Sequence, residues 1–323
     1  MPCAAAATLR DRMSLTVVGS IAYDAVKAPA GERERMLGGA ATHFALAASF
    51  FDEVRVIGPV GDDFDEQSWQ VLGTRGTITD DVERVAGGKT FFWRGEYHAG
   101  LNSRQTHETE LNVFETFEPK LSPAAAECDV LFLANIQPDL QRAVREQCSA
   151  ARFVAMDSMD LWINIARDSL VQTIRGVDCL LLNDEELETL AEKPNFVSAA
   201  REILTWGPSA VVAKQGKYGA ALFTKDGYFA LPAYPLEHVV DPTGAGDTFA
   251  GGFVGSIAAH PGESVDHDAL VRAMVYGTAL ASFNVEAFGT ERMTDLTAGE
   301  IAGRVGELQR MTTFEHAAIA LRG

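Results

Sequence analysis

Short apolar segments bounded by Gly, Asp or Asn recur along the chain, and they predict buried strands. These segments are 15–19 (LTVVG), 54–58 (VRVIG), 130–134 (VLFLA), 153–157 (FVAMD), 179–183 (CLLLN) and 210–214 (AVVAK). Largely continuous apolar runs are typical of parallel strands covered on both faces. Helix-like segments lie between them at 41–51, 139–149, 184–191 and 198–206. This alternation of strands and helices predicts a doubly wound α/β fold.

One region, residues 90–117, departs from this pattern because polar and aromatic residues alternate in it. Such a pattern predicts two half-exposed antiparallel strands joined by a polar turn, which do not belong inside a parallel sheet. The pattern alone leaves two interpretations open. The segment is either a simple edge hairpin, or a lid or dimer surface beside a functional site.

Composition narrows the class of partner. The chain has 323 residues, of which 47% are hydrophobic and 22% charged, as in soluble globular proteins, and its net charge is −18. So acidic a surface disfavours nucleic acid and anionic membranes as partners. Four cysteines without a C-x-x-C pair predict no zinc site or disulfide framework, and favour the cytoplasm. Residues 1–13 carry no signal-peptide pattern and are expected to be a frayed extension.

The segment richest in candidate chemistry is 241–253, DPTGAGDTFAGGF. Pro242 favours a turn after the strand-like run 235–240, and glycines at 244 and 246 allow a tight backbone there. A glycine turn at the start of a buried helix leaves several N–H groups pointing outward, where the helix dipole adds positive potential. The pattern therefore predicts an anion site suited to a phosphate.

Asp247 falls in the first turn of that predicted helix. A carboxylate there is able to cap the helix, which is the purely structural interpretation. It is also placed to take a proton from a hydroxyl that attacks a phosphorus atom held by the anion site. In the context of the whole segment, the catalytic interpretation is favoured.

The segment resembles, along its entire length, the C-terminal signature of the ribokinase (PfkB) family of carbohydrate and nucleoside kinases. The resemblance implies that Asp247 is the catalytic base and that Gly244, Ala245 and Gly246 form the anion hole. It spans residues 15–289 and implies a ribokinase-like three-layer α/β sandwich. Such a fold has a central, mostly parallel sheet and a small β-strand lid, which we assign to residues 90–117.

Three further stretches resemble the same family in the same order along the chain. Asp24 resembles the aspartate that binds substrate hydroxyls, although by itself it is also a turn residue closing a strand. Gly38 and Gly39 resemble a glycine pair that approaches the substrate. His43 stands where ribokinases carry a substrate-binding asparagine, so ribose-type recognition is in doubt, and a core or surface histidine is an equal alternative.

The nucleotide side of the resemblance lies at the carboxyl ends of two predicted strands. Asn183 and Glu186 resemble the N-x-x-E motif near the phosphates, with Glu186 helping to hold Mg²⁺ through water; acidic residues also simply favour a first helical turn. Lys214, Gly216 and Gly219 resemble the turn that borders ATP, although a hairpin turn explains these glycines equally well. Thr243 is expected near the nucleotide, and Asp241 and Thr243 are expected to contribute to a monovalent cation site, such as one for K⁺.

Other nucleotide-binding and hydrolytic motifs are absent from the sequence. The segment GGKT at 87–90 lacks the first glycine of a P-loop, which is Glu83 here, and no G-x-G-x-x-G, G-x-S-x-G or H-E-x-x-H pattern occurs. We therefore expect residues 14–323 to form one kinase domain that uses ATP and Mg²⁺ to phosphorylate a hydroxyl of a sugar or sugar-like substrate. The alternatives are a nucleoside kinase and a non-catalytic sugar-binding protein. Half-exposed lid strands suggest a homodimer.

Overall fold

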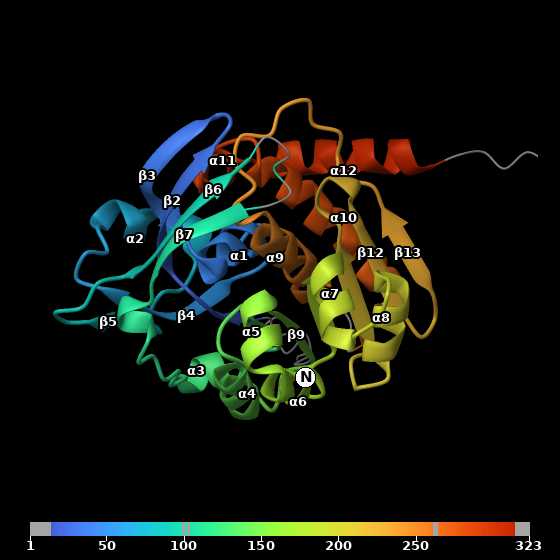
Figure 1. Cartoon of the computed structure of the whole chain (residues 1–323), viewed down its shortest axis with the longest axis horizontal. Helices are drawn as coiled ribbons and strands as arrows, with labels where there is room; N and C mark the ends of the chain where they lie inside the picture. Colours follow the sequence, from blue (N-terminus) through green and yellow to red (C-terminus); the bar gives the residue numbers. More distant parts are fainter. Residues whose placement is uncertain (1–13, 99–100, 102–103, 261–263, 314–323) are drawn as a thin grey trace, which may run out of the picture.

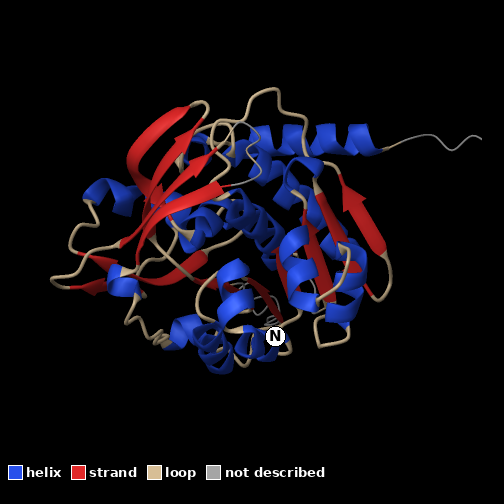
Figure 2. Cartoon of the chain, in the orientation of Figure 1, coloured by secondary structure: helices blue, strands red, loops and turns tan. Residues whose placement is uncertain are grey.

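The computed structural model describes residues 14–98, 101, 104–260 and 264–313, and a nine-stranded sheet forms its centre (Figures 1 and 2). The strand order is β13-β12-β11-β10-β9-β8-β1-β4-β5. The strands are β1 (Leu15–Val18), β4 (Val54–Gly61), β5 (Val82–Val85), β8 (Val130–Leu133), β9 (Phe153–Asp157), β10 (Cys179–Asn183), β11 (Ala210–Lys214), β12 (Ala220–Thr224) and β13 (Tyr228–Leu231). Strand pairs from β5 to β11 are parallel, whereas β12 and β13 are antiparallel to their neighbours.

Alternate residues of each central strand face two separate hydrophobic cores, which explains the continuous apolar runs. Val17, Phe132 and Leu181 pack into one core, whereas their neighbours Val18 and Leu131 pack into the other. Helices cover both faces, so the molecule has three layers. The expected fold class, a ribokinase-like α/β sandwich, is confirmed.

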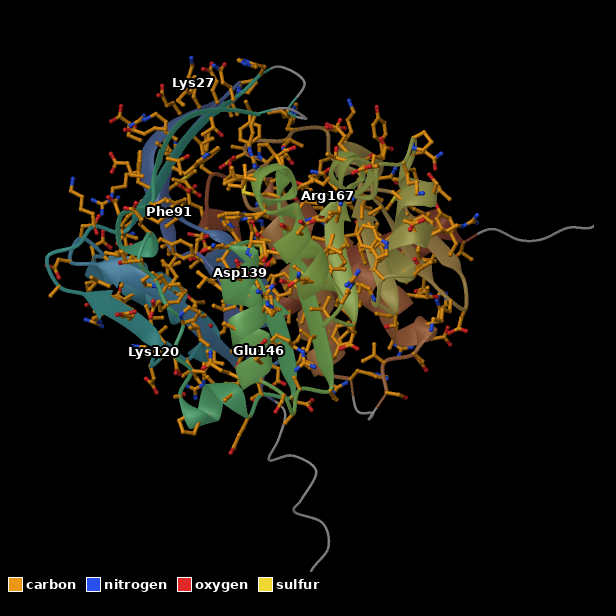
Figure 3. All side chains as sticks on the ribbon, turned by 60° about the horizontal axis from the view of Figure 1, so that its bottom comes forward. Lys27, Phe91, Lys120, Asp139, Glu146 and Arg167 are labelled. Atoms are coloured by element: carbon orange, nitrogen blue, oxygen red, sulfur yellow. The ribbon has the colours of Figure 1, made fainter. Side chains whose placement is uncertain are left out.

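The helices fall into two layers. On the first face lie α1 (Ala40–Ala48), α9 (Ala245–Ala258) and α10 (His267–Asn284), with α11 (Glu291–Asp295) and α12 (Ala298–Thr312) outside them. On the second lie α3 (Pro123–Ala126), α4 (Pro138–Gln147), α5 (Asp160–Ile165), α6 (Arg167–Ile174), α7 (Asp184–Ala191) and α8 (Phe196–Leu204). Figure 3 looks onto the second layer, where Asp139 and Glu146 mark α4 and Arg167 marks the start of α6. The short helix α2 (Glu66–Leu72) lies near the lid.

A second sheet of four strands, which we call the lid sheet, stands beside the central one (Figure 1). Its order is β3-β2-β6-β7, from β2 (Ala22–Ala28), β3 (Gly31–Gly38), β6 (Phe91–Tyr97) and β7 (Arg104–Glu110). The β6–β7 hairpin falls within the expected segment 90–117, although residues 112–114 form a 3₁₀ turn instead of continuing the strand. Strands β2 and β3 are not among the predicted elements. Five successive residues of β3 are exposed and carry no apolar pattern, whereas β2 is largely buried but includes the charged residues Asp24 and Lys27.

The main differences from expectation concern loops and helix ends. The run 235–240 is not a strand: Pro232 and Pro235 lack N–H donors, and the chain is held where Val240 N donates to Val285 O at 2.8 Å. The first helix stops at Ala48, three residues before the expected end. Cys128, Cys148 and Cys179 are free and buried, while residues 1–13, with Cys3, lie outside the described part. None of the helices in the described ranges has the length and apolar character needed to span a bilayer.

Candidate active site

The glycine turn predicted from the sequence lies at the start of α9. Gly244 is the N-terminal cap of this helix and has φ 72°, a left-handed conformation that favours glycine. Gly244 has no side chain to cap the helix, and Ala245 N donates to Pro242 O at 3.2 Å. The N–H groups of Gly246 and Asp247 have no acceptor within the helix, because they belong to its first turn, and so they are available to an anion. Asp247 stands in the same turn. The structure thus places Gly244, Ala245, Gly246 and Asp247 together as the sequence predicts.

The buried side chain of Asp241 fixes the backbone just before this turn. One carboxylate oxygen accepts from Thr243 N at 2.9 Å, and the other accepts from Gly289 N at 3.2 Å. Asp241 therefore ties the turn to the loop that follows α10, a segment that the sequence analysis left unassigned. Among the described residues, no three His, Cys, Asp or Glu side chains gather so as to hold a metal ion.

His43 of α1 packs against the glycine turn. A methyl group placed on Gly244 would overlap three ring atoms of His43, so the imidazole lies against this glycine. The ring is only 1% exposed, and neither of its nitrogens has a hydrogen-bond partner among the described residues. Burial lowers its pKa, against the charges of Asp247 and Asp241, so the ring is neutral at pH 7. Its expected contact with substrate stays a prediction.

Asp24 lies on β2 of the lid sheet and not in a turn. Its carboxylate presses against Gly38, where a methyl group would overlap one carboxylate oxygen. Gly39, at φ 94°, also has no room for a side chain, because a methyl group there would lie 2.5 Å from Ser20 O. Burial raises the pKa of Asp24 to about 7, and the negative charges of Asp241 and Asp247 add to the shift. The backbone N–H of Gly39 and the Arg104 guanidinium oppose it. The carboxyl of Asp24 on the lid sheet therefore lies within electrostatic range of Asp241 in the loop before α9 and of Asp247 in the first turn of α9.

The raised pKa of Asp24 predicts a pH-dependent stability. Between the ordinary pKa of 3.8 and about 7, the folded protein holds a proton that the unfolded chain has lost, so stability falls as pH rises through this window. Each unit of pKa shift corresponds to about 1.4 kcal/mol. We expect Asp24→Asn to raise the melting temperature relative to wild type at pH 8 and to have little effect at pH 4. Equal effects at both pH values would contradict the assignment.

The nucleotide-side residues end three adjacent strands of the central sheet. Asn183 and Lys214 are register partners at the ends of β10 and β11, and Asp157 ends the neighbouring β9. A methyl group on Gly246 would lie 3.0 Å from Lys214 Nζ, so this ammonium stands beside the glycine turn. The carboxyl edge of the sheet and the start of α9 therefore form one continuous site.

Asp157 is a site residue that the sequence analysis missed. It is 3% exposed and one of its carboxylate oxygens has no hydrogen-bond partner in the described structure. Burial raises its pKa well above the ordinary value, Asp247 and Glu186 add to the shift, and Lys214 opposes it. The available signal was its position, because Asp157 closes a buried strand just as Asn183 and Lys214 do.

Asn183 and Glu186 form a capping box at the start of α7. Glu186 N donates to Asn183 Oδ1 at 2.7 Å, and Asn183 N donates to Glu186 Oε2 at 2.9 Å. This bears out the structural interpretation, but it uses only one oxygen of Glu186. Burial raises the pKa of Glu186 to about 7, although Lys214 and the Asn183 N–H lower it. The second oxygen leaves room for a further role.

The two glycines after Lys214 differ in their surroundings. The hairpin that they were alternatively expected to form is present, since β11 and β12 are antiparallel. Gly219 has φ 110° and a methyl group there would overlap Leu231 O, so packing against β13 accounts for this glycine. Gly216 has φ 53° with open space around it. Contact of either glycine with a nucleotide stays a prediction.

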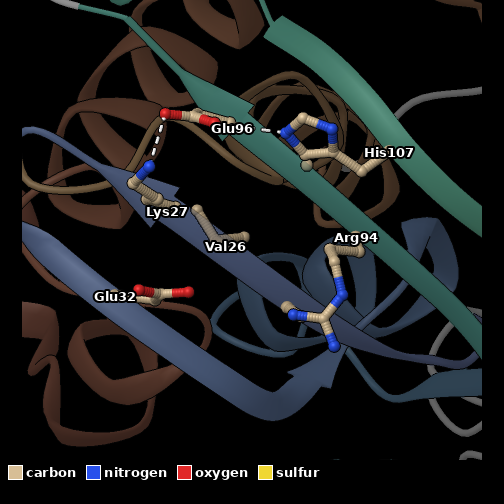
Figure 4. A pocket seen from close by; sticks show the side chains of 8 residues that line it. Val26, Lys27, Glu32, Arg94, Glu96 and His107 are labelled. Atoms are coloured by element: carbon tan, nitrogen blue, oxygen red, sulfur yellow. Dashed lines mark hydrogen bonds and ion pairs between the residues drawn. The ribbon is translucent and has the colours of Figure 1, made fainter.

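The two faces of the lid sheet differ in character. On the inner face, Thr243 Oγ1 donates to Tyr97 OH at 3.4 Å. The outer face carries a small hollow shown in Figure 4, where Lys27 Nζ lies 2.8 Å from Glu96 Oε1 and His107 Nε2 lies 3.2 Å from Glu96 Oε2. This hollow contains none of the predicted site residues. Dimerisation through the lid stays a prediction.

Comparisons with known proteins place the chain among kinases. Residues 12–296 match the family model of the pfkB family carbohydrate kinases. A cytidine kinase of Thermococcus kodakarensis is 28% identical over 250 residues, which cover 75% of this chain and 87% of the relative. A ribokinase of Bacillus subtilis is 26% identical over 299 residues, covering 86% and 94%. Among solved structures, a Burkholderia thailandensis nucleoside kinase in complex with inosine superposes with a TM-score of 0.77 at 19% identity, covering 91% and 97%.

The chain therefore belongs to the pfkB family of carbohydrate kinases. The expected enzyme class, a phosphotransferase with an alcohol group as acceptor, is confirmed, because the relatives are kinases of that class. At this level of description the protein is a sugar or nucleoside kinase. The relatives do not assign roles to individual residues of this chain.

Proposed function

We propose that the protein transfers the γ-phosphoryl group of ATP to a hydroxyl of a sugar or of a sugar moiety, with Asp247 as the base. The observation that carries the proposal is the convergence of two charged groups on the glycine turn. Asp247 stands in the turn itself, and Lys214 approaches Gly246 from the sheet edge. Asp24 faces them from the lid sheet, close enough for its pKa to rise in response to Asp247.

Each part supplies one requirement of phosphoryl transfer. The N–H groups of Gly244, Ala245 and Gly246 stabilise the negative charge of the transferring group, and Lys214 adds a positive charge beside them. Asp247 accepts the proton of the acceptor hydroxyl. The oxygen of that hydroxyl forms the new bond to the γ-phosphorus while the bond between this phosphorus and ADP breaks. Asp24, with the backbone at Gly38 and Gly39, holds neighbouring hydroxyls. The lid excludes water, which competes as acceptor.

Glu186 is proposed to hold Mg²⁺ through water, with Asn183 beside the phosphates. A Mg²⁺ ion held there would supply positive charge that offsets the negative charge of the phosphates. It keeps much of its hydration and takes few protein ligands, which agrees with the one oxygen of Glu186 that takes no part in the capping box. Asp241 and Thr243 are proposed for K⁺, with both oxygens of Asp241 already accepting one backbone N–H each.

Glu186→Gln separates the capping role from the magnesium role. A glutamine preserves the capping box, so the melting temperature is expected to change little. Loss of the charge is expected to raise the Mg²⁺ concentration for half-maximal activity about tenfold to a hundredfold. The matched control is Glu300→Gln, because Thr297 and Glu300 form the same capping box on α12. Identical Mg²⁺ titrations for the two variants would contradict the proposal.

The acceptor class is tested by ADP release from Mg·ATP with a panel of sugars and nucleosides. A sugar was the first expectation from the sequence. The cytidine kinase among the relatives favours a nucleoside as second candidate. Turnover with one class alone identifies the acceptor. Absence of turnover together with thermal stabilisation by a sugar but not by ATP would favour the third interpretation, a sugar-binding protein.

A further inference from the structure

Trp93 on β6 lies directly across from Asp24 on the neighbouring strand. Asp24 and Trp93 are register partners in the parallel pair β2–β6, and partners in such a pair project from the same face of the sheet. Trp93 packs against the small apolar cluster that contains Tyr97, and Val240, the residue just before Asp241, packs against the same cluster. The charged side chains Arg94 and Glu96 alternate with Trp93 along β6 and line the outer hollow (Figure 4). The indole therefore belongs to the inner face.

The indole is held flat and in one orientation. A side chain on Gly95 would overlap its six-membered ring, so the glycine makes room for the ring against the strand. Trp93 Nε1 donates to Thr106 Oγ1 at 3.3 Å, and the Arg104 guanidinium lies 5.8 Å from the ring centroid. Trp93 is only partly buried, unlike Tyr97. An oriented, partly uncovered aromatic face thus stands beside the carboxylate proposed to bind hydroxyls.

We propose that Trp93 is the stacking platform for the nucleobase of a nucleoside acceptor. The inference rests on the proposed function, since it takes Asp24 as the ligand of the sugar hydroxyls. Adjacent strands are about 4.8 Å apart, so the indole on β6 lies within reach of the ring substituent of a furanose held at Asp24 on β2. A planar base covers the indole face and stacks on it, whereas a free sugar leaves that face uncovered.

The first experiment measures binding without turnover. Quenching of tryptophan fluorescence by cytidine, adenosine and inosine is compared in Asp247→Asn and in Asp247→Asn with Trp93→Phe, with ribose as the matched ligand that lacks a base. We expect nucleosides, but not ribose, to quench a component that Trp93→Phe removes. Fluorescence quenching reports binding and does not depend on a catalytic base, so the result remains valid even if Asp247 proves dispensable for turnover. Binding of ribose without binding of any nucleoside would overturn the proposal.

The second experiment separates stacking from packing. Trp93→Phe keeps an aromatic face, whereas Trp93→Leu fills much of the volume without one. We expect the leucine variant to raise KM for the nucleoside about tenfold to a hundredfold, with kcat little changed and the KM of any slow ribose turnover unaltered. The phenylalanine variant is expected to keep most of the affinity. Equal losses for nucleoside and ribose, or equal behaviour of the two variants, would show that Trp93 only packs the lid.

Discussion

Asp247→Asn is expected to lower kcat for phosphoryl transfer by about 10²- to 10⁴-fold, the range contributed by a positioned general base. An asparagine keeps the shape of the side chain at the start of α9 but accepts no proton from the acceptor hydroxyl. ADP release from Mg·ATP with the acceptor found in the panel is the measurement. The KM values are expected to change much less than kcat, because the carboxylate acts mainly in the transition state.

A matched control isolates catalysis from helix stability. Asp268 is exposed and occupies the first turn of α10, as Asp247 occupies the first turn of α9. Both aspartates interact with a helix dipole, which is worth about 0.3–1 kcal/mol. Asp268→Asn is therefore expected to cost similar stability and no activity. Turnover that survives in Asp247→Asn would remove Asp247 as the base.

Gly244→Ala is expected to lower kcat by about 10²- to 10³-fold, comparable to the loss of one donor in an oxyanion hole. The backbone of Gly244 has φ 72°, which strains any other residue, and the added methyl group overlaps the buried ring of His43. The turn must move to relieve both, which displaces the N–H groups from the phosphate. The same ADP-release assay measures the effect, together with the melting temperature.

Two companions separate the causes of that loss. Gly303 lies on α12 with open space around it. Gly303→Ala is therefore expected to keep full activity, with a small gain in stability. Adding His43→Ala to Gly244→Ala removes the overlap but leaves the strained backbone. His43→Ala alone measures the effect of losing the imidazole, so partial recovery in the double variant relative to His43→Ala would assign the remainder to strain. Full activity in Gly244→Ala would show that the turn does not hold the phosphoryl group.

The large sheet was predictable from sequence because its strands are buried on both faces and so carry uninterrupted apolar runs. The lid was harder, since β3 is exposed along GERER and resembles a polar loop. In the lid sheet, β2 pairs with β6, and these two strands lie about seventy residues apart in the chain. No local sequence pattern indicates such a pairing. A tight turn depends on the residues within it, so the glycines of 241–253 were enough to predict the turn at the start of α9.

The residues of the candidate site could be predicted where several of them form one sequence motif, but not where a single residue has no motif around it. Asp157 follows four apolar residues and stands in no motif, so the one signal in the sequence is its position at the end of a buried strand. Its electrostatic interaction with Asp247 and Lys214 depends on the fold. Arg104 is likewise a single charge on an exposed strand, and its influence on Asp24 depends on the fold. For Asn183 and Glu186, a capping box and a magnesium site need the same residue types, so the sequence does not separate the two roles.

The proposed acceptor carboxylate and the proposed base belong to different parts of the fold. Asp24 belongs to the lid sheet, whereas Asp247 begins a helix packed on the central one. The distance over which the new phosphorus–oxygen bond forms is consequently set by how the two sheets dock and not by the geometry within either. A molecule that binds to the lid sheet but does not place its hydroxyl beside Asp247 and the phosphoryl group binds without reacting. Discrimination among similar alcohols therefore falls on kcat as much as on affinity.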